Sequence, residues 1–488
     1  MSKIKQSTEI ATNRYKAKPI FAEEKKFIES RLPQIAPLPD ACWIYGGNTK
    51  TVWADLYSSQ YLLKFKVENG GEFSVLKDNR SLFKDYTPVS LKDTLECEKE
   101  RVNNLYNKCV DRLSDYVKNN PQKTYKINHS GGKDSELTMA IWNDMLDIIG
   151  FTPDYEFVFF NTSNETADVY KRIKQIPNIR IVNPKTGWRQ WIIQNKNYIL
   201  PSVFRRSCCS VYKEGQAQKI FDKEAEIAQV LGVRKFESTK RAKYEFFMDY
   251  NFDKSLFGFS CFSKKWIKLA PIIDLQNVDV WLLLMIKNLP INQRYLSGSS
   301  RVGCVICPYS SNYEDELIKI HQPHQYEWFV KAAQQQYDIT TAKRLGYTKQ
   351  EWIDGAWKRP VCKNNDFLKR QPTKENVRWY AELKGLSENM AKKYFNRVCG
   401  NCGCAMKENE IAMFYKLCGR FENKPDNREV LCAKCFCKQF GITIEEYRQK
   451  ILNLWNKDVI CFDKKYIERK TKWVKSQSYQ KQPLIQFR

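Results

Sequence analysis

The stretch INHSGGKDS at residues 127–135 decides the fold expected for the surrounding chain. An apolar run enters a Ser-Gly-Gly turn, and a helical pattern over residues 136–149 follows directly. Glycines let the backbone approach an anion closely, and the first free N–H groups of the helix point at it, helped by the helix dipole. Lys133 adds a positive charge, and Asp134 could position Mg²⁺. The loop predicts a phosphate site formed by Ser130, Gly131, Gly132, Lys133, Asp134 and Ser135.

Strands and helices alternate around this loop. Residues 157–160 (FVFF) are expected to form a strand, residues 168–175 a helix and residues 179–182 another short strand. Before the loop, the apolar positions of residues 92–119 repeat with the period of a helix. Such order predicts an α/β fold with a parallel sheet flanked by helices.

The sequence SGGKDS resembles the PP-loop of the adenine-nucleotide α-hydrolase superfamily, whose members split ATP between its α- and β-phosphates. Its spacing differs from that of a Walker A loop. Three other segments are similar to the phosphoadenosine phosphosulfate (PAPS) reductase family of that superfamily. These are FFNTSNE at residues 159–165, GVRKFESTKR at residues 232–241, and the Pro-Ile and Asp-Val-Trp pieces of residues 271–281. The resemblance extends over about residues 120–335.

The resemblance implies roles for particular residues. The loop would hold the β- and γ-phosphates, with Lys133 and Asp134 acting in catalysis beside Arg234 and Arg241, which would stabilise charge on the α-phosphate. The nucleotide would also contact the strand-end segment at Asn161 and Glu165. Two alternatives stay open for Glu165: contact with the ribose or base, or capping of the helix that follows.

Four cysteines of the same region form a second pattern. Vicinal cysteines followed by a Cys-x-x-Cys pair resemble the set that holds a 4Fe–4S cluster in adenosine-phosphosulfate reductases and in DndC-type proteins of DNA phosphorothioation. Zinc bound by the same thiolates is the alternative. The residues are Cys208, Cys209, Cys304 and Cys307.

One departure from the family limits the function. Sulfonucleotide reductases use a C-terminal cysteine in an E-C-G-x-H segment, whereas this chain has no histidine after His324. We therefore expect a PP-loop ATP pyrophosphatase that releases AMP and pyrophosphate, adenylates an acceptor and acts in sulfur transfer to DNA or RNA. A cysteine desulfurase would be a suitable sulfur-donor partner. The alternatives are a phosphoadenylyl- or adenylyl-sulfate reductase and a nucleotide-gated nucleic-acid-binding protein without turnover.

A second cysteine pattern lies near the C-terminus. Two Cys-x-x-Cys knuckles suit tetrahedral Zn²⁺, because each tight turn supplies two thiolates. We expect a structural zinc site, although Cys404, Cys418 or Cys437 could replace a ligand. The expected ligands are Cys399, Cys402, Cys432 and Cys435.

Composition bounds the class of protein. Among 488 residues, 81 Lys and Arg oppose 55 Asp and Glu, a net charge of +26 that favours a polyanionic partner over none. Its densest apolar run, residues 280–286, is too short to span a bilayer, and residues 1–16 lack the apolar core of a signal peptide. Expected location is therefore the cytoplasm, without membrane contact.

The chain is expected to contain five parts. Hairpin signals, above all Asn-Gly-Gly at residues 69–71, give the first part its β character. The parts are a β-leaning accessory module (1–95), the PP-loop catalytic domain (96–335), a helical segment (336–398), the zinc module (399–463) and a basic tail (464–488).

Overall fold

The computed structural model describes residues 9–10, 14–196, 198, 200–203, 207–221, 226–238, 241–249, 251, 266–339, 346–359, 387–389, 399, 402, 410 and 431–456. The chain divides into two compact units, Met1–Thr340 with Thr348–Arg359, and Thr341–Tyr347 with Pro360–Arg488. The basic tail predicted at 464–488 lies outside the described residues, and so does much of the segment predicted at 336–398. No helix within the described ranges is long and apolar enough to cross a membrane.

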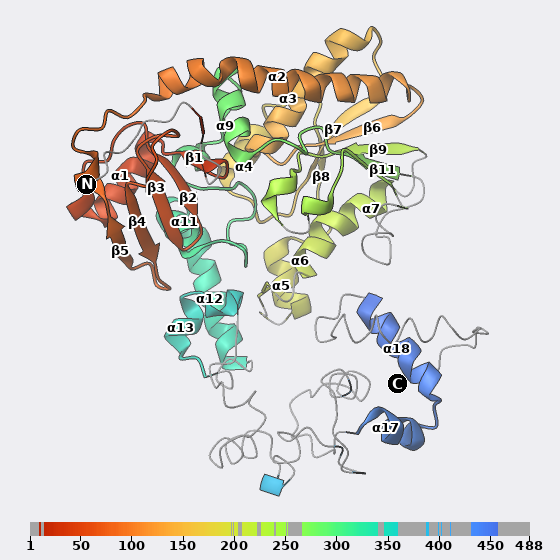
Figure 1. Ribbon diagram of the computed structural model, residues 1–488. Helices are drawn as coiled ribbons and strands as arrows, with labels where there is room; N and C mark the ends of the chain where they lie inside the picture. Colours follow the sequence, from red (N-terminus) through yellow and green to blue (C-terminus); the bar gives the residue numbers. More distant parts are fainter. Residues whose placement is uncertain are drawn as a thin grey trace. The chain divides into compact units, whose positions relative to one another are not determined.

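A six-stranded sheet forms the centre of the first unit (Figure 1). Its neighbouring strands are parallel except at one edge, where β10 runs antiparallel to β11, so the predicted sheet is mixed at that edge. The order is β10 (Phe247–Met248), β11 (Trp266–Leu269), β9 (Ile227–Val230), β6 (Thr124–Asn128), β7 (Tyr155–Phe160) and β8 (Arg180–Val182).

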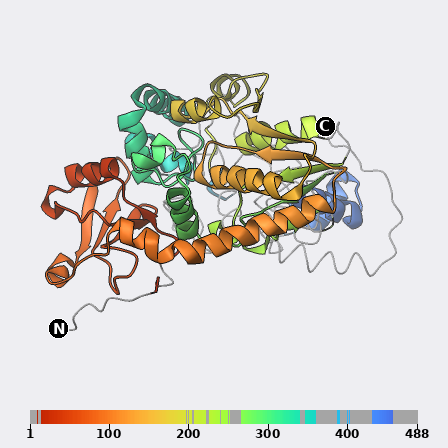
Figure 2. The same ribbon diagram turned by 90° about the horizontal axis from the view of Figure 1, so that it is seen from above.

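Helices cover both faces of this sheet. Successive side chains of β7 point to opposite faces of the sheet. Phe159 packs in the hydrophobic cluster that contains α4, and its neighbour Phe160 contacts α7 on the other face. The long helix α2, the orange helix of Figure 2, packs on α3 and α9. The helices are α2 (Leu91–Lys118), α3 (Lys133–Ile149), α4 (Ala167–Ile173), α7 (Gly215–Phe221) and α9 (Asn277–Ile286).

The N-terminal part of the same unit is an antiparallel five-stranded sheet that packs on α1 and on Tyr313 and Leu317. Its β4–β5 hairpin confirms the one predicted from the Asn-Gly-Gly turn. Buried Glu24 pairs with Lys18 and accepts a hydrogen bond of 3.0 Å from Tyr313 of α11. The elements are β1 (Lys18–Pro19), α1 (Ala22–Arg31), β2 (Trp43–Gly46), β3 (Thr49–Trp53), β4 (Leu63–Val67) and β5 (Phe73–Asp78).

The remaining helices carry or support the cysteines. In the first unit they are α5 (Trp188–Lys196), α6 (Ser207–Cys209) with the π-helical turn Ser210–Glu214, α10 (Gln293–Leu296), α11 (Asn312–His321), α12 (Pro323–Ile339) and α13 (Lys349–Ile353). Trp352 and Trp357 are buried. The second unit contains α17 (Ala433–Phe440) and α18 (Ile444–Asn456).

Candidate functional site

Strand order places a binding site at one end of the parallel sheet. The chain runs outward from β6 through β7 to β8, and later crosses to β9 on the other side of β6. Ligands of open α/β sheets bind at the carboxyl ends of the strands, where the order reverses. The phosphate loop follows β6 and Arg234 follows β9, so both predicted segments lie at this switch point.

The loop is closed by its own hydrogen bonds. Gly131 has φ +72°, a left-handed conformation that favours glycine. The Ser135 hydroxyl oxygen accepts from the N–H groups of Ser130 (3.2 Å) and Gly132 (3.3 Å). The Lys133 N–H donates to the hydroxyl of Tyr295 at 3.2 Å. The backbone N–H groups that a phosphate would need are therefore close together, and the hydroxyl groups of Ser135 and Tyr295 accept from them.

Asp134 joins the predicted cations. Its Oδ2 lies 2.5 Å from Lys133 Nζ, and its Oδ1 accepts from Arg234 Nε at 2.6 Å. Burial opposes ionisation of this carboxyl, but Arg234 and Lys133 lower its pKa to about 2. Gly232 lets the Arg234 segment approach, because a Cβ at Gly232 would lie 2.8 Å from the Asp134 carbonyl oxygen. Arg241 is near the same carboxylate and pairs with Glu237.

A buried histidine forms a hydrogen bond with the loop backbone. His129 Nδ1 accepts from the Gly131 N–H at 3.2 Å, and its Nε2 faces Glu136 Oε1 at 3.4 Å. Arg172 donates hydrogen bonds to both carboxylate oxygens of Glu136, at 2.6 and 2.8 Å. Burial alone would raise the pKa of Glu136, but Arg172 and His129 lower it. His129 thus accepts a hydrogen bond from a backbone N–H group of the loop.

The strand-end segment folds as a self-contained turn. Glu165 accepts from the N–H and hydroxyl of Thr162 and from the Asn164 N–H, at 3.2, 2.6 and 3.3 Å. Asn161 Oδ1 accepts from the Ser163 N–H at 2.7 Å and from the Tyr170 hydroxyl at 2.9 Å. These bonds hold the Glu165 carboxylate inside its own turn, and none of them comes from an N–H group of the following helix α4, so they do not show the predicted helix cap.

The structure brings the four predicted cluster cysteines into one neighbourhood. A hydrogen bond with Cys209, burial, and the thiols of Cys304 and Cys307 raise the pKa of Cys208. Nevertheless, these four are not among the described groups whose ligand atoms all lie within 4.8 Å of one another. Within the residues that the structure describes, these four thiols therefore do not form a compact ligand group.

One segment connects the loop with these thiols. A Cβ at Gly132 would lie 3.7 Å from Val302 Cβ, so residue 302 lies against the phosphate loop. Two residues later, Cys304 Sγ is 4.0 Å from the Thr162 hydroxyl, and the Val305 N–H donates to the Asn164 carbonyl at 2.6 Å. The two predicted sites are thus neighbours.

Two exposed cations near the thiols were missed by the sequence reasoning. Lys213 lies four residues after Cys209, and the charge of Cys304 raises the pKa of Lys213. Arg301 lies three residues before Cys304 and acts on Lys213 and Arg241. Neither Lys213 nor Arg301 forms an ion pair with any residue that the structure describes. Basic residues a few positions from each cysteine pair were the only sequence signal for them.

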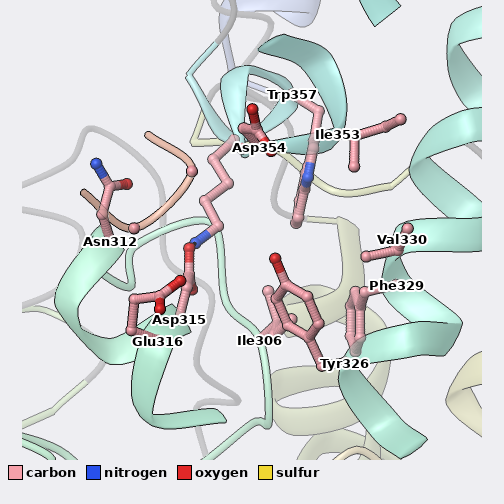
Figure 3. Close-up of a pocket in the computed structure, with 14 residues that line it drawn as sticks. Ile306, Asn312, Asp315, Glu316, Tyr326, Phe329, Val330, Ile353, Asp354 and Trp357 are labelled. Carbon is pink, nitrogen blue, oxygen red and sulfur yellow. Dashed lines mark hydrogen bonds and ion pairs between the residues drawn. The ribbon is translucent and has the colours of Figure 1, made fainter. Parts of the chain in front are cut away.

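A small pocket adjoins the cysteine loop at Ile306 (Figure 3). Ile306, Tyr326, Phe329 and Trp357 supply apolar and aromatic walls. Its carboxylates are occupied: Asp315 pairs with Lys358, and Glu316 with Arg31 and Lys319. The phosphate loop does not line it.

Residues 124–310 match the phosphoadenosine phosphosulfate reductase domain. The chain thus contains a region that is similar to the PAPS reductase domain. The matched range includes the loop, both arginines and the four predicted cluster cysteines. The family comprises adenine-nucleotide enzymes of sulfur chemistry, as the resemblance of the sequence motifs implied.

Relatives extend the comparison. An uncharacterized protein of Methanocaldococcus jannaschii is 27% identical over 329 residues, which cover 66% of this chain and 70% of that protein. The adenosine 5'-phosphosulfate reductase of Staphylococcus epidermidis is 26% identical over 173 residues, covering 33% of this chain and 64% of the reductase. A tRNA thiolase of Methanococcus maripaludis, solved with its 4Fe–4S cluster, is only weakly similar: TM-score 0.27, 16% identity, 49% of this chain and 78% of the thiolase.

The second unit contains a candidate metal centre. The Sγ atoms of Cys399, Cys402, Cys432 and Cys435 all lie within 4.8 Å of one another, and Cys402 and Cys432 are 3.8 Å apart. This spacing agrees with the tetrahedral geometry of one Zn²⁺. Cys437, a possible substitute, donates to the Thr443 carbonyl instead, and Cys404 and Cys418 fall outside the described residues.

Proposed function

We propose that the PAPS reductase domain is an ATP pyrophosphatase that adenylates an acceptor in sulfur transfer to a nucleic acid. The observation that carries this proposal is the adjacency of loop and thiols through the segment from Val302 to Cys304. An acceptor activated at the loop would lie next to groups that can handle sulfur. The family resemblance supports use of an adenine nucleotide.

Adenylation is a displacement at phosphorus. An acceptor oxygen attacks the α-phosphorus, the bond to the α,β-bridging oxygen breaks, and pyrophosphate leaves with the electron pair. Lys133 and the N–H groups of the loop would bind the leaving pyrophosphate, while Arg234 and Arg241 would stabilise charge on the α-phosphate. Hydrosulfide then displaces AMP, which carries away the acceptor oxygen, and leaves a carbon–sulfur bond on the acceptor.

Asp134 explains how the ligand-free loop stays stable. Its carboxylate neutralises Lys133 and Arg234, the cations that a triphosphate would neutralise instead. When phosphates bind, both cations can turn to them, and the released carboxylate becomes available to Mg²⁺, which prefers oxygen ligands. The pairing therefore supports exchange between an internal and an external anion.

The resemblance of the Cys208, Cys209, Cys304 and Cys307 pattern to the cluster cysteines of adenosine-phosphosulfate reductases supports a 4Fe–4S cluster, in which each thiolate would bind a different iron atom. Such a cluster would supply redox chemistry or a binding point for sulfur. The chain's own contribution is the fixed position of Cys304 beside the Thr162 turn.

A polyanionic acceptor is supported by the charges around the thiols. Lys213 and Arg301 are exposed and unpaired within the described ranges, and Arg241 is near Arg301. The charge of Arg301 opposes those of Lys213 and Arg241, so a bound anion among these cations would relieve that repulsion. A phosphate backbone would neutralise them and release counterions.

The proposal is tested by trapping the activated acceptor. The full chain is incubated without oxygen with Mg²⁺ and ATP labelled on the α-phosphate, without a sulfur source, and with DNA or tRNA. Label bound to one nucleic acid supports the proposal, and K213Q/R301Q should lower that transfer while the exposed-lysine control K108Q/K118Q on α2 leaves it unchanged. Labelling of neither nucleic acid, although ATP is consumed, would contradict a nucleic-acid acceptor.

A further inference from the structure

A single helical turn contacts both predicted sites. It is α10 with its N-terminal cap, residues 292–296, and its side chains point in two directions. Toward the phosphate loop, Asn292 Nδ2 donates to the carbonyl oxygens of Gly131 at 3.2 Å and Asp168 at 3.3 Å. Tyr295 accepts from the Lys133 N–H at 3.2 Å, and its ring packs edge-on against Trp281.

The residue between them faces the cysteine loop. Arg294 is buried, and its guanidinium donates to the Ser299 hydroxyl at 3.1 Å. It also donates to the carbonyl oxygens of three consecutive residues, Gly303 at 3.2 Å and Cys304 and Val305 at 3.4 Å each. A buried guanidinium has few other partners, so the backbone around Cys304 is fixed by the position of this turn.

The Tyr295 hydroxyl occupies the Lys133 N–H group, for which a bound phosphate would compete. The Lys133 N–H is the first donor of α3, the kind of group that a phosphate binds at a helix N-terminus. A phosphate that takes this donor must displace the hydroxyl, and Tyr295 is one residue from Arg294. A change in the hydrogen bonding of the loop can therefore reach Cys304 through Tyr295 and its neighbour Arg294.

We propose that Asn292, Arg294 and Tyr295 are positioning residues that couple occupancy of the phosphate loop to the conformation of the Cys304 segment. The inference rests on the proposed function only in requiring that the loop binds phosphate. Because coupling between equilibria is reciprocal, the conformation of the Cys304 segment that phosphate favours is also the one in which the loop binds phosphate more tightly.

The test uses the metal-free full chain and inorganic pyrophosphate as the probe. Calorimetry gives pyrophosphate affinity, and peptide mass spectrometry gives the rate at which iodoacetamide alkylates Cys304. In the wild type we expect saturating pyrophosphate to change that rate about fivefold, the lower end of ordinary coupling. Exposed Cys97 is the internal control, and its rate should not change.

Variants separate coupling from simple electrostatics. Y295F should bind pyrophosphate but lose the change at Cys304, whereas a purely electrostatic effect of the bound anion would persist in Y295F. N292A should reduce the coupling too, which keeps the test decisive if one variant folds poorly. Y106F, a buried tyrosine on α2 that donates to Asp144, should couple like the wild type.

Two results would overturn the proposal. Either the wild type binds pyrophosphate without a change at Cys304, or Y295F and N292A couple as fully as the wild type. Absence of pyrophosphate binding in the wild type would overturn the proposed function as well, and the calorimetric titration distinguishes that failure from loss of coupling alone.

Discussion

Asp134 is the residue on which the phosphate site depends most. Its two oxygens hold Lys133 and Arg234, and its lowered pKa keeps it ionised at any working pH. Removing its charge frees both cations for an external anion. We expect D134N to bind Mg-free pyrophosphate about tenfold more tightly than the wild type, about 1.4 kcal/mol, and to lose ATP turnover. Calorimetry measures the affinity, and D144N on the outer part of α3 is the control. Unchanged or weaker binding by D134N would show that this carboxylate does not compete with phosphate.

Lys133 gives the site a pH dependence. Burial lowers its pKa to about 8, with a further contribution from Arg234 and Arg241 and an opposing one from Asp134. The ammonium is therefore lost as pH rises through about 8, and a phosphate then loses a cationic partner. We expect pyrophosphate affinity to fall up to about tenfold per pH unit above that value in the wild type. K133R should hold its affinity constant to about pH 10, because arginine stays charged. An equal fall in K133R would assign the titration to another group.

Single residues were predictable where a motif fixed them. The glycines, Lys133 and Asp134 follow from the Ser-Gly-Gly turn, and the structure places Arg234 against Asp134. Arg294 and Tyr295 carry no motif, because their role depends on a tertiary contact. Tyr295 lies 162 positions after Lys133, the loop residue that it contacts. Glu165 has the residue type of a ligand, but local hydrogen bonds use it inside its own turn.

Among the elements, α1 is attached to α11 through buried charges. Glu24 is fully buried, pairs with Lys18 and accepts from Tyr313. We expect E24A to lower the free energy of unfolding by about 3–5 kcal/mol, because it leaves the Lys18 ammonium buried and unpaired. Urea unfolding followed by circular dichroism measures it. The exposed pair of Lys25 and Asp40 is the matched control, and D40A should have no measurable effect. Equal stability of E24A and the wild type would mean that water solvates the Lys18 site.

Longer elements were predictable and very short ones were not. β6, β7 and α2 follow from apolar runs and helical periodicity that extend over many residues. β10 has two residues, too few for any periodicity, and its antiparallel pairing with β11 is decided by the fold around it. Similarly, α10 has only four residues, so its place beside both sites is a tertiary effect.

At the scale of the whole molecule, two separate cysteine sets predict two separable metals. We expect about one zinc per chain, lost in C432S/C435S, and iron that is lost in C208S/C209S but kept when zinc is removed. Structural zinc contributes folding free energy only to the unit that binds it, so zinc-free protein should still bind pyrophosphate with wild-type affinity. Elemental analysis with calorimetry checks this. Loss of both metals in either variant would contradict independent sites.

The proposed reaction is cleavage of ATP between its α- and β-phosphates. To test it, the anaerobically purified full chain is incubated with Mg-ATP, with and without nucleic acid and hydrosulfide, and the nucleotide products are separated. We expect AMP and pyrophosphate in equal amounts, at a rate raised by one nucleic acid and abolished in D134N. Formation of ADP and phosphate, or no turnover under any of these conditions, would contradict it.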